Sequence, residues 1–272
     1  MSDRQFNFGE NWDAFSRNAL TGQRVAQAEQ HFRQLLDGIE LENRSFLDIG
    51  FGQGLGLLIA RSLRARAVGC DINPICAEVL AANARRHFPQ LNGGECPVIV
   101  GSILDEKVIE QVRRTAVTGE KAFDVVHSWG VLHHTGDMWS AIRNAASLVR
   151  PGGHLVIAIY ARHWSSRMWK FVKWLYVHAP RFIQRTLIAL FYPIIYAAKW
   201  MVTQRDPHQQ KRGMDFYYDV IDWVGGYPYE FATTEELTRE VEALGFTTSK
   251  VIPAQVPTGC NEFVFQRCID RT

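Results

Sequence analysis

Up to Tyr160, short apolar runs alternate with stretches in which apolar residues recur at helical spacing. The apolar runs are bounded by glycine or polar residues and predict buried strands at residues 45–50, 67–72, 97–102, 123–129 and 154–160. The stretches between them predict helices near 57–65, 73–87, 105–116 and 138–149. Continuous apolar strands separated by helices are typical of a parallel sheet covered on both faces, so we expect a doubly wound α/β fold.

After Tyr160 the strand pattern stops, and helical periodicity continues to about residue 232. The α/β pattern then returns with a helix over 233–246, which Thr233 or Thr234 can cap and Gly245 can end. Two closing strands, near 247–252 and 261–268, predict an antiparallel hairpin at the sheet edge. We therefore expect four parts: an N-terminal helical segment (1–40), an α/β core (41–160), a helical insertion (161–232) and a C-terminal helix with two strands (233–272).

Composition and charge narrow the class of protein. The chain has 272 residues, of which 47% are hydrophobic and 21% charged, so it can bury a core and is neither disordered nor coiled-coil. The net charge of +2 gives no reason to expect a nucleic-acid partner. The five cysteines form no CxxC pair, and the N-terminus is polar without a signal-peptide pattern. These features predict a cytoplasmic globular protein with reduced thiols.

The strongest local signal is the run FLDIGFGQG at residues 46–54, where the first strand meets the first helix of the core. Glycines at such a turn let the backbone approach a ligand closely. The spacing is GxGxG, and Leu55 stands where a nicotinamide-dinucleotide fingerprint has its third glycine. Asp48 at the strand end would also repel a pyrophosphate. Both departures favour a nucleoside without phosphates, with a nicotinamide-dependent oxidoreductase as the alternative.

Asp71, at the end of the second strand, is the second element of this site. It follows the glycine loop by about 20 residues, the spacing at which an acid accepts hydrogen bonds from ribose hydroxyls. Taken alone, Asp71 is equally a cap for the helix that starts near Asn73. The glycine loop and the acid together, in this order and spacing, favour the nucleoside site.

With these residues in place, the sequence resembles the class I S-adenosylmethionine-dependent methyltransferases. The matching motifs are LDIGFGQG (47–54), VGCDI (68–72), VGSI (100–103), DVVHSWGVLHH (124–134) and LVRPGGHLVIAIY (148–160). The resemblance covers about residues 40–160 and, more loosely, 233–272. It is greatest to small-molecule methyltransferases of quinone and natural-product pathways. It implies a Rossmann-like, seven-stranded sheet that carries the helical insertion after its fifth strand.

The resemblance also implies where S-adenosylmethionine would bind. The methionine part would lie over residues 48–54, the ribose on Asp71, and the adenine between Ile72 and Ile103. The main chain of Ser128 and Trp129 would line the sulfonium. The full set of implied cofactor residues is Asp48, Gly50, Phe51, Gly52, Gly54, Asp71, Ile72, Ser102, Ile103, Ser128 and Trp129. Family members often have an acid at the position of Ser102.

Methyl transfer from a sulfonium needs an aligned nucleophile, exclusion of water and, for a hydroxyl or ammonium acceptor, a general base. His133 and His134 follow the fourth strand, at the sheet edge where α/β proteins bind ligands. We expect one of them, His134 first, to act as the base or to orient the acceptor; the alternative is a structural turn. The segment SWGVLHH lacks the acids that hold a metal in some quinone O-methyltransferases, so no metal is expected.

The insertion is rich in aromatic and basic residues. It holds five of the eight tryptophans, and between Ala161 and Met214 there are ten Lys or Arg residues against one acid. In residues 164–177, the basic Arg167, Lys170 and Lys173 recur every three positions. Met168, Phe171, Val172 and Leu175 fall opposite, which predicts a basic amphipathic helix. The run at 186–198 has 13 uncharged residues, too few to span a bilayer, and Pro193 interrupts it.

Three interpretations of the insertion stay open. It can be a lid over a hydrophobic acceptor, a peripheral membrane contact through 164–200 at the inner face, or a helical subdomain or dimer surface. The candidate acceptor contacts are Trp12, Tyr217, Tyr218, Trp223 and Asn261. Asp215, Asp219 and Asp222 share one helix face, which either points into the cleft or is solvated.

The N-terminal aromatic residues Phe6, Phe8, Trp12 and Phe15 either close over the cofactor or dock as an ordinary terminal helix. The sequence therefore predicts a methyltransferase acting on an oxygen or nitrogen atom of a small, apolar acceptor, with no nucleic-acid partner. A cofactor-binding protein without transfer activity, acting at a membrane, is the remaining alternative.

Overall fold

A single mixed sheet organises the chain, and the computed structural model describes residues 5–91, 96–116, 121–208 and 213–269. The strands are β1 (Ser45–Ile49), β2 (Arg66–Asp71), β3 (Val98–Val100), β4 (Phe123–Trp129), β5 (Val149–Tyr160), β6 (Phe246–Ile252) and β7 (Cys260–Arg267). Their order is β3-β2-β1-β4-β5-β7-β6, with β1 to β5 parallel and β7 antiparallel to both β5 and β6. This confirms the doubly wound fold and the closing antiparallel pair.

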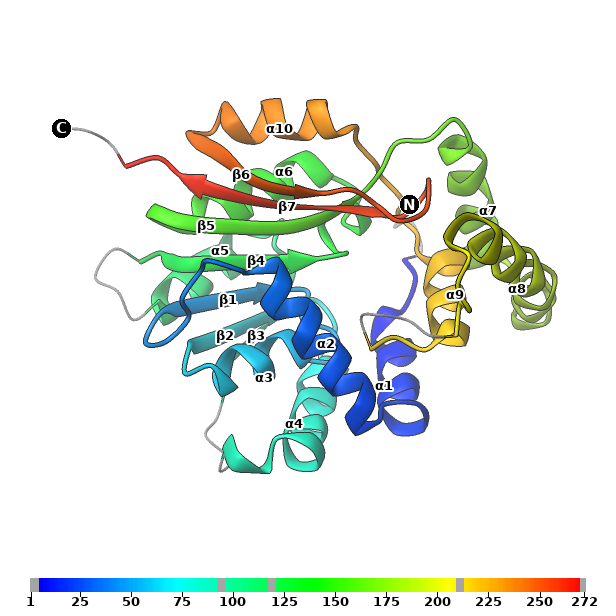
Figure 1. Cartoon of the computed structure of the whole chain (residues 1–272), viewed down its shortest axis with the longest axis horizontal. Helices are drawn as coiled ribbons and strands as arrows, with labels where there is room; N and C mark the ends of the chain where they lie inside the picture. The colour runs from blue at the N-terminus through cyan, green and yellow to red at the C-terminus, as the bar shows by residue number, and fades with distance from the viewer. Residues whose placement is uncertain (1–4, 92–95, 117–120, 209–212, 270–272) are drawn as a thin grey trace.

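Helices cover both faces of the sheet (Figure 1). The core helices are α1 (Phe8–Asn18), α2 (Gly22–Leu35), α3 (Leu55–Ser62), α4 (Ile75–His87), α5 (Glu106–Thr115), α6 (Met138–Ser147) and α10 (Thr234–Glu242), with short 3₁₀ turns η1 (Pro89–Leu91) and η2 (Leu132–His134). Local chemistry sets their ends. Thr233 caps α10 in a reciprocal capping box with Glu236.

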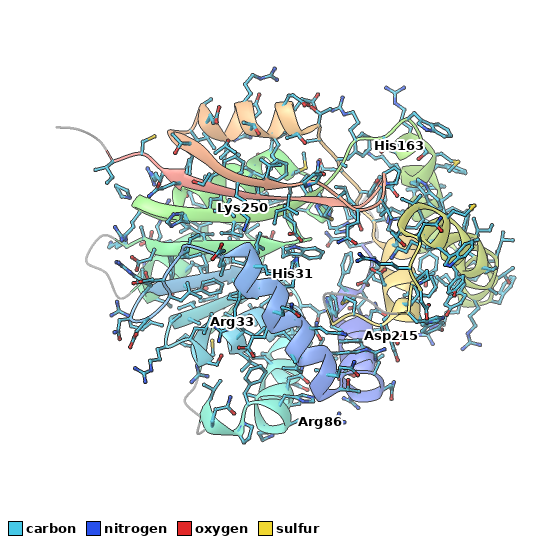
Figure 2. All side chains as sticks on the ribbon, viewed as in Figure 1. His31, Arg33, Arg86, His163, Asp215 and Lys250 are labelled. Carbon is cyan, nitrogen blue, oxygen red and sulfur yellow. The ribbon has the colours of Figure 1, made fainter. Side chains whose placement is uncertain are left out.

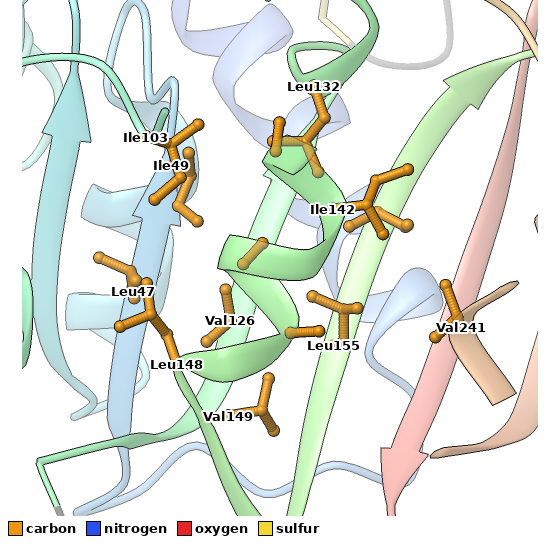
Figure 3. Packing of buried hydrophobic residues seen from close by; sticks show 14 of the residues in the cluster. Leu47, Ile49, Ile103, Val126, Leu132, Ile142, Leu148, Val149, Leu155 and Val241 are labelled. Carbon is orange, nitrogen blue, oxygen red and sulfur yellow. The ribbon is translucent and has the colours of Figure 1, made fainter. Parts of the chain in front are cut away.

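The two faces of the sheet bury different apolar sets because successive strand residues point to opposite sides. Leu47 of β1 and Val126 of β4 pack with α5, α6 and α10 (Figure 3), whereas Phe46 and Val125 pack with helices α1 to α4. Each fully buried side chain of this size stabilises the fold by about 1.5–3 kcal/mol. The two packed faces thus fix the carboxyl ends of the parallel strands, where the site lies.

The insertion forms α7 (Ser166–His178), α8 (Arg181–Thr203) and α9 (Phe216–Gly225), gathered beyond one end of the sheet (Figure 1). The three helices share a small apolar cluster that includes Val177, Ile188, Ile195, Phe216, Val220 and Val224. The insertion is attached to the N-terminal segment, because the Phe6 N–H donates to the Tyr227 carbonyl at 2.9 Å. The name helical insertion is kept for residues 161–232, which include these three helices.

The predicted orientation of α7 is wrong in one respect: Lys173 is fully buried, while Met168 is 52% and Phe171 61% exposed. The reason is geometric. Three residues turn an α-helix by about 300°, so Lys173 lies about 120° around the axis from Arg167 rather than above it. Arg167 and Lys170 are exposed as expected, and they share the outer surface with apolar side chains.

Lys173 is held by a carbonyl and by aromatic rings. Its Nζ donates to the Trp223 carbonyl and lies 4.8 Å from the ring centre of Tyr229 and 5.5 Å from those of Tyr160 and Trp223. Burial lowers the pKa of Lys173 to about 7. This side chain therefore joins α7 to α9, to β5 and to the segment before α10.

The expectation for residues 186–198 is also corrected. Pro193 does not interrupt the helix: α8 runs through it for 23 residues, and at 1.5 Å per residue is about 35 Å long. By length and composition α8 is apolar enough to cross a membrane. In the structure, Ile188 and Ile195 are buried against the rest of the insertion, but only 11% of the apolar window of α8 is buried.

The buried Lys173 generates a stability prediction. Lys173→Ala should lower the free energy of unfolding by about 2–5 kcal/mol, because it leaves a cavity inside the insertion. Lys173→Met fills most of that volume without a buried charge and should stay within about 1.5 kcal/mol of the wild type. Urea unfolding followed by tryptophan fluorescence measures both.

The matched control is Lys170→Ala on the same helix, where an exposed side chain should change stability by about 0.5 kcal/mol or less. A Lys173→Ala variant as stable as this control would contradict the burial of Lys173.

Candidate active site

A cavity of about 450 Å³ lies between the carboxyl ends of the parallel strands and the helical insertion. Open α/β sheets bind ligands at this edge, and the volume is in the range of small-molecule sites. One part of its wall comes from the ends of β1, β2 and β4. The other part comes from the N-terminal segment, β5, α8 and α9.

The glycine loop between β1 and α3 forms the first part of the wall. Gly50, Gly52 and Gly54 have φ values of +71°, +52° and +81°, which L side chains rarely adopt. A Cβ at Gly52 would also lie 2.8 Å from the Trp12 indole nitrogen. The residues at 50–53 line the cavity, whereas Gly54 packs behind them against Leu80. The predicted close approach of backbone to the cavity is thus present at Gly50 and Gly52.

Asp71 connects this loop to the second strand. Its Oδ2 accepts the Gly52 N–H at 2.9 Å, and its Oδ1 accepts the Asn73 N–H at 2.9 Å. Burial raises the pKa of Asp71, and the two main-chain donors oppose that rise. The Cys76 thiol also bonds to this carboxylate, so about one of its roughly four acceptor sites stays available, and the side chain lines the cavity. Helix α4 starts beyond it, at Ile75, so Asp71 orders the turn before the helix rather than capping it.

The chemistry around Asp71 fits a nucleoside. Ile72, which is 58% exposed, and Ile103 offer apolar surfaces in the same wall as the acid, and Ser102 also lines it. Within the described ranges, the cavity wall includes one lysine, Lys199, and no arginine. Lys199 is paired with Asp219 on the opposite side from the glycine loop. An acid with apolar neighbours and no nearby cation suits ribose hydroxyls and a base, not a pyrophosphate.

Asp48 lies under the glycine loop and is paired with a residue that sequence reasoning missed. Its Oδ1 is 2.7 Å from His127 Nδ1, and both side chains are buried and line the cavity. The pair exists because β1 and β4 are adjacent, with Asp48 opposite His127 in the register. A histidine within the apolar run 123–129 was the available signal.

Ser128 and Trp129 are also implied to bind the cofactor, and their side chains lie in different places. The Ser128 side chain is fully buried, donates to the Ile49 carbonyl at 2.9 Å and lies behind the cavity wall. The Trp129 side chain lines the cavity and donates its indole N–H to Glu262 at 2.9 Å. Glu262 also lies 3.0 Å from His31 of α2 (Figure 2), so one carboxylate fixes two rings of this wall.

The second part of the cavity is aromatic. Phe6, Phe8, Trp12, Tyr160 and Trp223 line it. Of the five predicted acceptor contacts, the structure therefore brings Trp12 and Trp223 to the cavity.

The other three predicted contacts lie elsewhere. Tyr217 is 49% exposed, and the Tyr218 hydroxyl accepts from Asn18. The Asn261 amide oxygen accepts the Ala254 N–H, and its NH₂ donates to Thr234. Tyr217 and Tyr218 lie on other faces of α9 than Trp223, and Asn261 lies in β7. The sequence pattern did not distinguish these positions.

The rings of the two predicted histidines lie 4.4 Å apart, but of the two only His134 lines the cavity. His134 lines the cavity, its Nδ1 lies 2.6 Å from the Pro228 carbonyl, and its ring lies 4.7 Å from that of Phe8. Burial lowers the pKa of His134 to about 3, so the ring is neutral and donates through Nδ1. His133 is fully buried outside the cavity wall, with its ring centre 4.2 Å from that of Tyr160. The structure therefore brings one of the two to the site.

Carboxylates from α9 also lie in the second, aromatic part of the cavity wall. Asp215 begins the helix (Figure 2), caps it and pairs with Arg24, whereas Asp219 and Asp222 line the cavity. Asp222 Oδ1 accepts from Asn11 Nδ2 at 2.6 Å. Two of the three acids on the predicted face thus point into the cleft. Among the described residues, no group of three potential metal ligands was found.

Comparison with known proteins adds independent findings. A family model described as a methyltransferase domain matches residues 23–251. The ubiquinone biosynthesis O-methyltransferase of Alkalilimnicola ehrlichii is 30% identical over 123 residues, which are 45% of this chain and 44% of that protein. The chain thus matches less than half the length of this curated relative.

Solved structures share the fold. An O-methyltransferase family protein from Burkholderia thailandensis has a TM-score of 0.56 at 16% identity, over 96% of this chain and 60% of that one. The magnesium protoporphyrin IX methyltransferase of Synechocystis PCC 6803, solved with bound S-adenosylmethionine, has a TM-score of 0.51 at 12% identity, over 90% of this chain and 80% of that one.

Proposed function

The chain belongs to the methyltransferase-domain family, in which S-adenosylmethionine is the methyl donor, and we propose that it methylates an oxygen atom of a small, largely apolar acceptor. One observation carries the proposal: the glycine loop with Asp71 and an aromatic wall border the same cavity. The names of the curated relatives favour oxygen over nitrogen. The family match favours this reading over a nicotinamide-dependent oxidoreductase.

The residues of the first part of the wall would hold the cofactor. Asp71 would accept hydrogen bonds from the ribose hydroxyls, the backbone at 50–53 would lie along the methionine part, and Ile72 and Ile103 would contact the base. The bound sulfonium supplies an already activated methyl group. The protein's task is then to align the acceptor and exclude water, which the aromatic side chains around Trp12 and Trp223 do.

His134 fits the role of orienting the acceptor. Its ring lines the cavity and is fixed by the Pro228 and Gly226 carbonyls, so it can position the acceptor by contact. A pKa of about 3 makes this ring a weak base at neutral pH. We assign no step to His133, because it lies outside the cavity wall.

The function is tested by turnover. With radiolabelled S-adenosylmethionine and a panel of phenols and quinols bearing alkyl chains of increasing length, we expect O-methyl ethers, with kcat/KM rising with chain length as more apolar area is buried. Trp223→Ala should flatten that rise without changing cofactor affinity. Tyr217→Ala, on the same helix but outside the cavity, should behave as the wild type.

Methylation of amines but not hydroxyls would contradict the oxygen assignment. Cofactor binding without turnover of any acceptor would favour the alternative of a binding protein.

We further propose peripheral contact with a membrane from the cytoplasmic side. Large apolar side chains are exposed just before α7 and along α7 and α8, and we call them the outer apolar face: Trp164, Met168, Phe171, Trp174, Phe182, Leu190, Ile194, Trp200, Met201 and Val202. Exposed apolar area of this extent is rare on soluble monomers. Exposed arginines and lysines accompany it, including Arg167, Lys170, Arg181 and Arg185. Anionic lipid headgroups are the complementary surface.

This contact is measured by co-sedimentation with vesicles of phosphatidylcholine alone or with phosphatidylglycerol. We expect binding to the anionic vesicles that weakens with salt, and a several-fold loss in Phe171→Ser/Phe182→Ser. Leu244→Ser, exposed on the core, is the control. Absence of binding, with a concentration-dependent dimer in solution, would show instead that a second copy covers this face.

A further inference from the structure

Asp219 and Asp222 of α9 line the aromatic part of the cavity, where we propose that the acceptor binds, and the two carboxylates have different partners. Asp219 forms an ion pair with Lys199 Nζ at 2.5 Å, so its charge is compensated by a cation. No cation among the described residues lies within 4.0 Å of Asp222. Asp222 is thus the less compensated acid of the pair, on the same wall as Trp223 and His134.

Asn11 of α1 fixes the orientation of Asp222. Its side chain is 7% exposed, and its amide nitrogen lies 2.6 Å from Asp222 Oδ1 and 3.3 Å from the Tyr218 carbonyl. The bond to Oδ1 is short, as charge-assisted hydrogen bonds are. No donor in the described chain bonds to Oδ2. One oxygen is therefore anchored and the other has its lone pairs available.

The surroundings of Asp222 disfavour its charged form. Burial raises the pKa of Asp222 to about 8, and the nearby Asp219 carboxylate adds to the rise. The hydrogen bond from Asn11 and the charge of Lys173 on α7 both lower the pKa in part. The hydroxyls of Tyr160 on β5 and Tyr176 on α7 also face this region, and both have raised pKa values because they are buried. A carboxyl with a pKa near the working pH is a far better base for a phenol, whose pKa is about 10, than an ordinary aspartate.

The other polar groups of the cavity are engaged elsewhere or hold their protons. His134 binds the Pro228 carbonyl, and Asp71 and Asp48 are bonded around the glycine loop. Lys199 is paired, and the Tyr160 hydroxyl stays protonated. Among the described carboxylates of the wall, Asp222 then combines an available oxygen with a position on the aromatic part.

We propose that Asp222 is the general base of the methyl transfer, with Asn11 as its positioning residue. The proton of the acceptor hydroxyl passes to Asp222 Oδ2 as the acceptor oxygen bonds to the methyl carbon. The electron pair of the broken carbon–sulfur bond stays on sulfur, which becomes a neutral thioether. The carboxyl group later returns its proton to water. This assignment rests on the proposed transfer to oxygen and names the acceptor class: a phenol or enol rather than a carboxylic acid.

The decisive variant is Asp222→Asn, because an amide oxygen can still accept from Asn11 while the basic carboxylate is gone. Toward an alkylphenol, turnover should fall about 10²–10⁴-fold, with cofactor affinity unchanged by calorimetry. Toward the matching nitrophenol, already ionised at the assay pH, the loss should be about tenfold or less. In the wild type, kcat should rise with pH through about 8, because the base must be deprotonated. Asp206→Asn, on the exposed segment after α8, is the control.

A second measurement needs no acceptor. In the full-length protein with S-adenosylhomocysteine, the infrared difference between wild type and Asp222→Asn should show a protonated carboxyl band that disappears with a midpoint near pH 8. An Asp222 already ionised at about pH 5 overturns the proposal, as does an equal loss of turnover on both phenols. Failure of the wild type to methylate any hydroxyl would instead contradict the proposed function, and the infrared titration would still decide the state of Asp222.

Discussion

The Asp71 carboxylate, held between two main-chain N–H groups, is the interaction on which the site depends. It accepts from Gly52 in the loop after β1 and from Asn73 in the turn after β2, so it ties two parallel strands together at their carboxyl ends. Gly50 and Gly52 have positive φ values, which glycine adopts without strain, and this conformation lets the loop backbone approach Asp71 closely enough to make the bond. That contact positions the glycine loop against the turn after β2.

The helical insertion distributes polarity in an unusual way. Its inner surface holds charged groups, with Lys173 among aromatic rings and Asp222 on the cavity wall, while its outer surface is largely apolar. Burying a charged group costs free energy unless the group is paired and hydrogen-bonded, and uncompensated groups are expected mainly where they have a function. Lys173 has partners, and Asp222 has a use in the proposed proton transfer. An apolar outer face and an aromatic cavity beneath it are both suited to an acceptor that partitions into lipid.

The sequence predicted what local pattern determines and missed what packing determines. The parallel strands, the glycine loop and Asp71 follow from short-range spacing, and the structure has them in place. Lys173 was expected in solvent because a three-residue repeat resembles a helix face. The contacts of Asp48 with His127 and of Asn11 with Asp222 join residues 79 and 211 positions apart, so the pairings themselves depend on the fold, although a histidine in the apolar run 123–129 was a local signal for the first.

The central claim is that this cavity binds a sulfonium nucleoside through Asp71. The most direct test is calorimetric titration of the wild type and Asp71→Ala with S-adenosylmethionine and, separately, with NADH. We predict micromolar binding of S-adenosylmethionine, weakened by about 1.5–3 kcal/mol or roughly 10- to 150-fold in the variant, and no binding of NADH. Binding of NADH, or equal affinity of the two proteins for S-adenosylmethionine, would contradict the account.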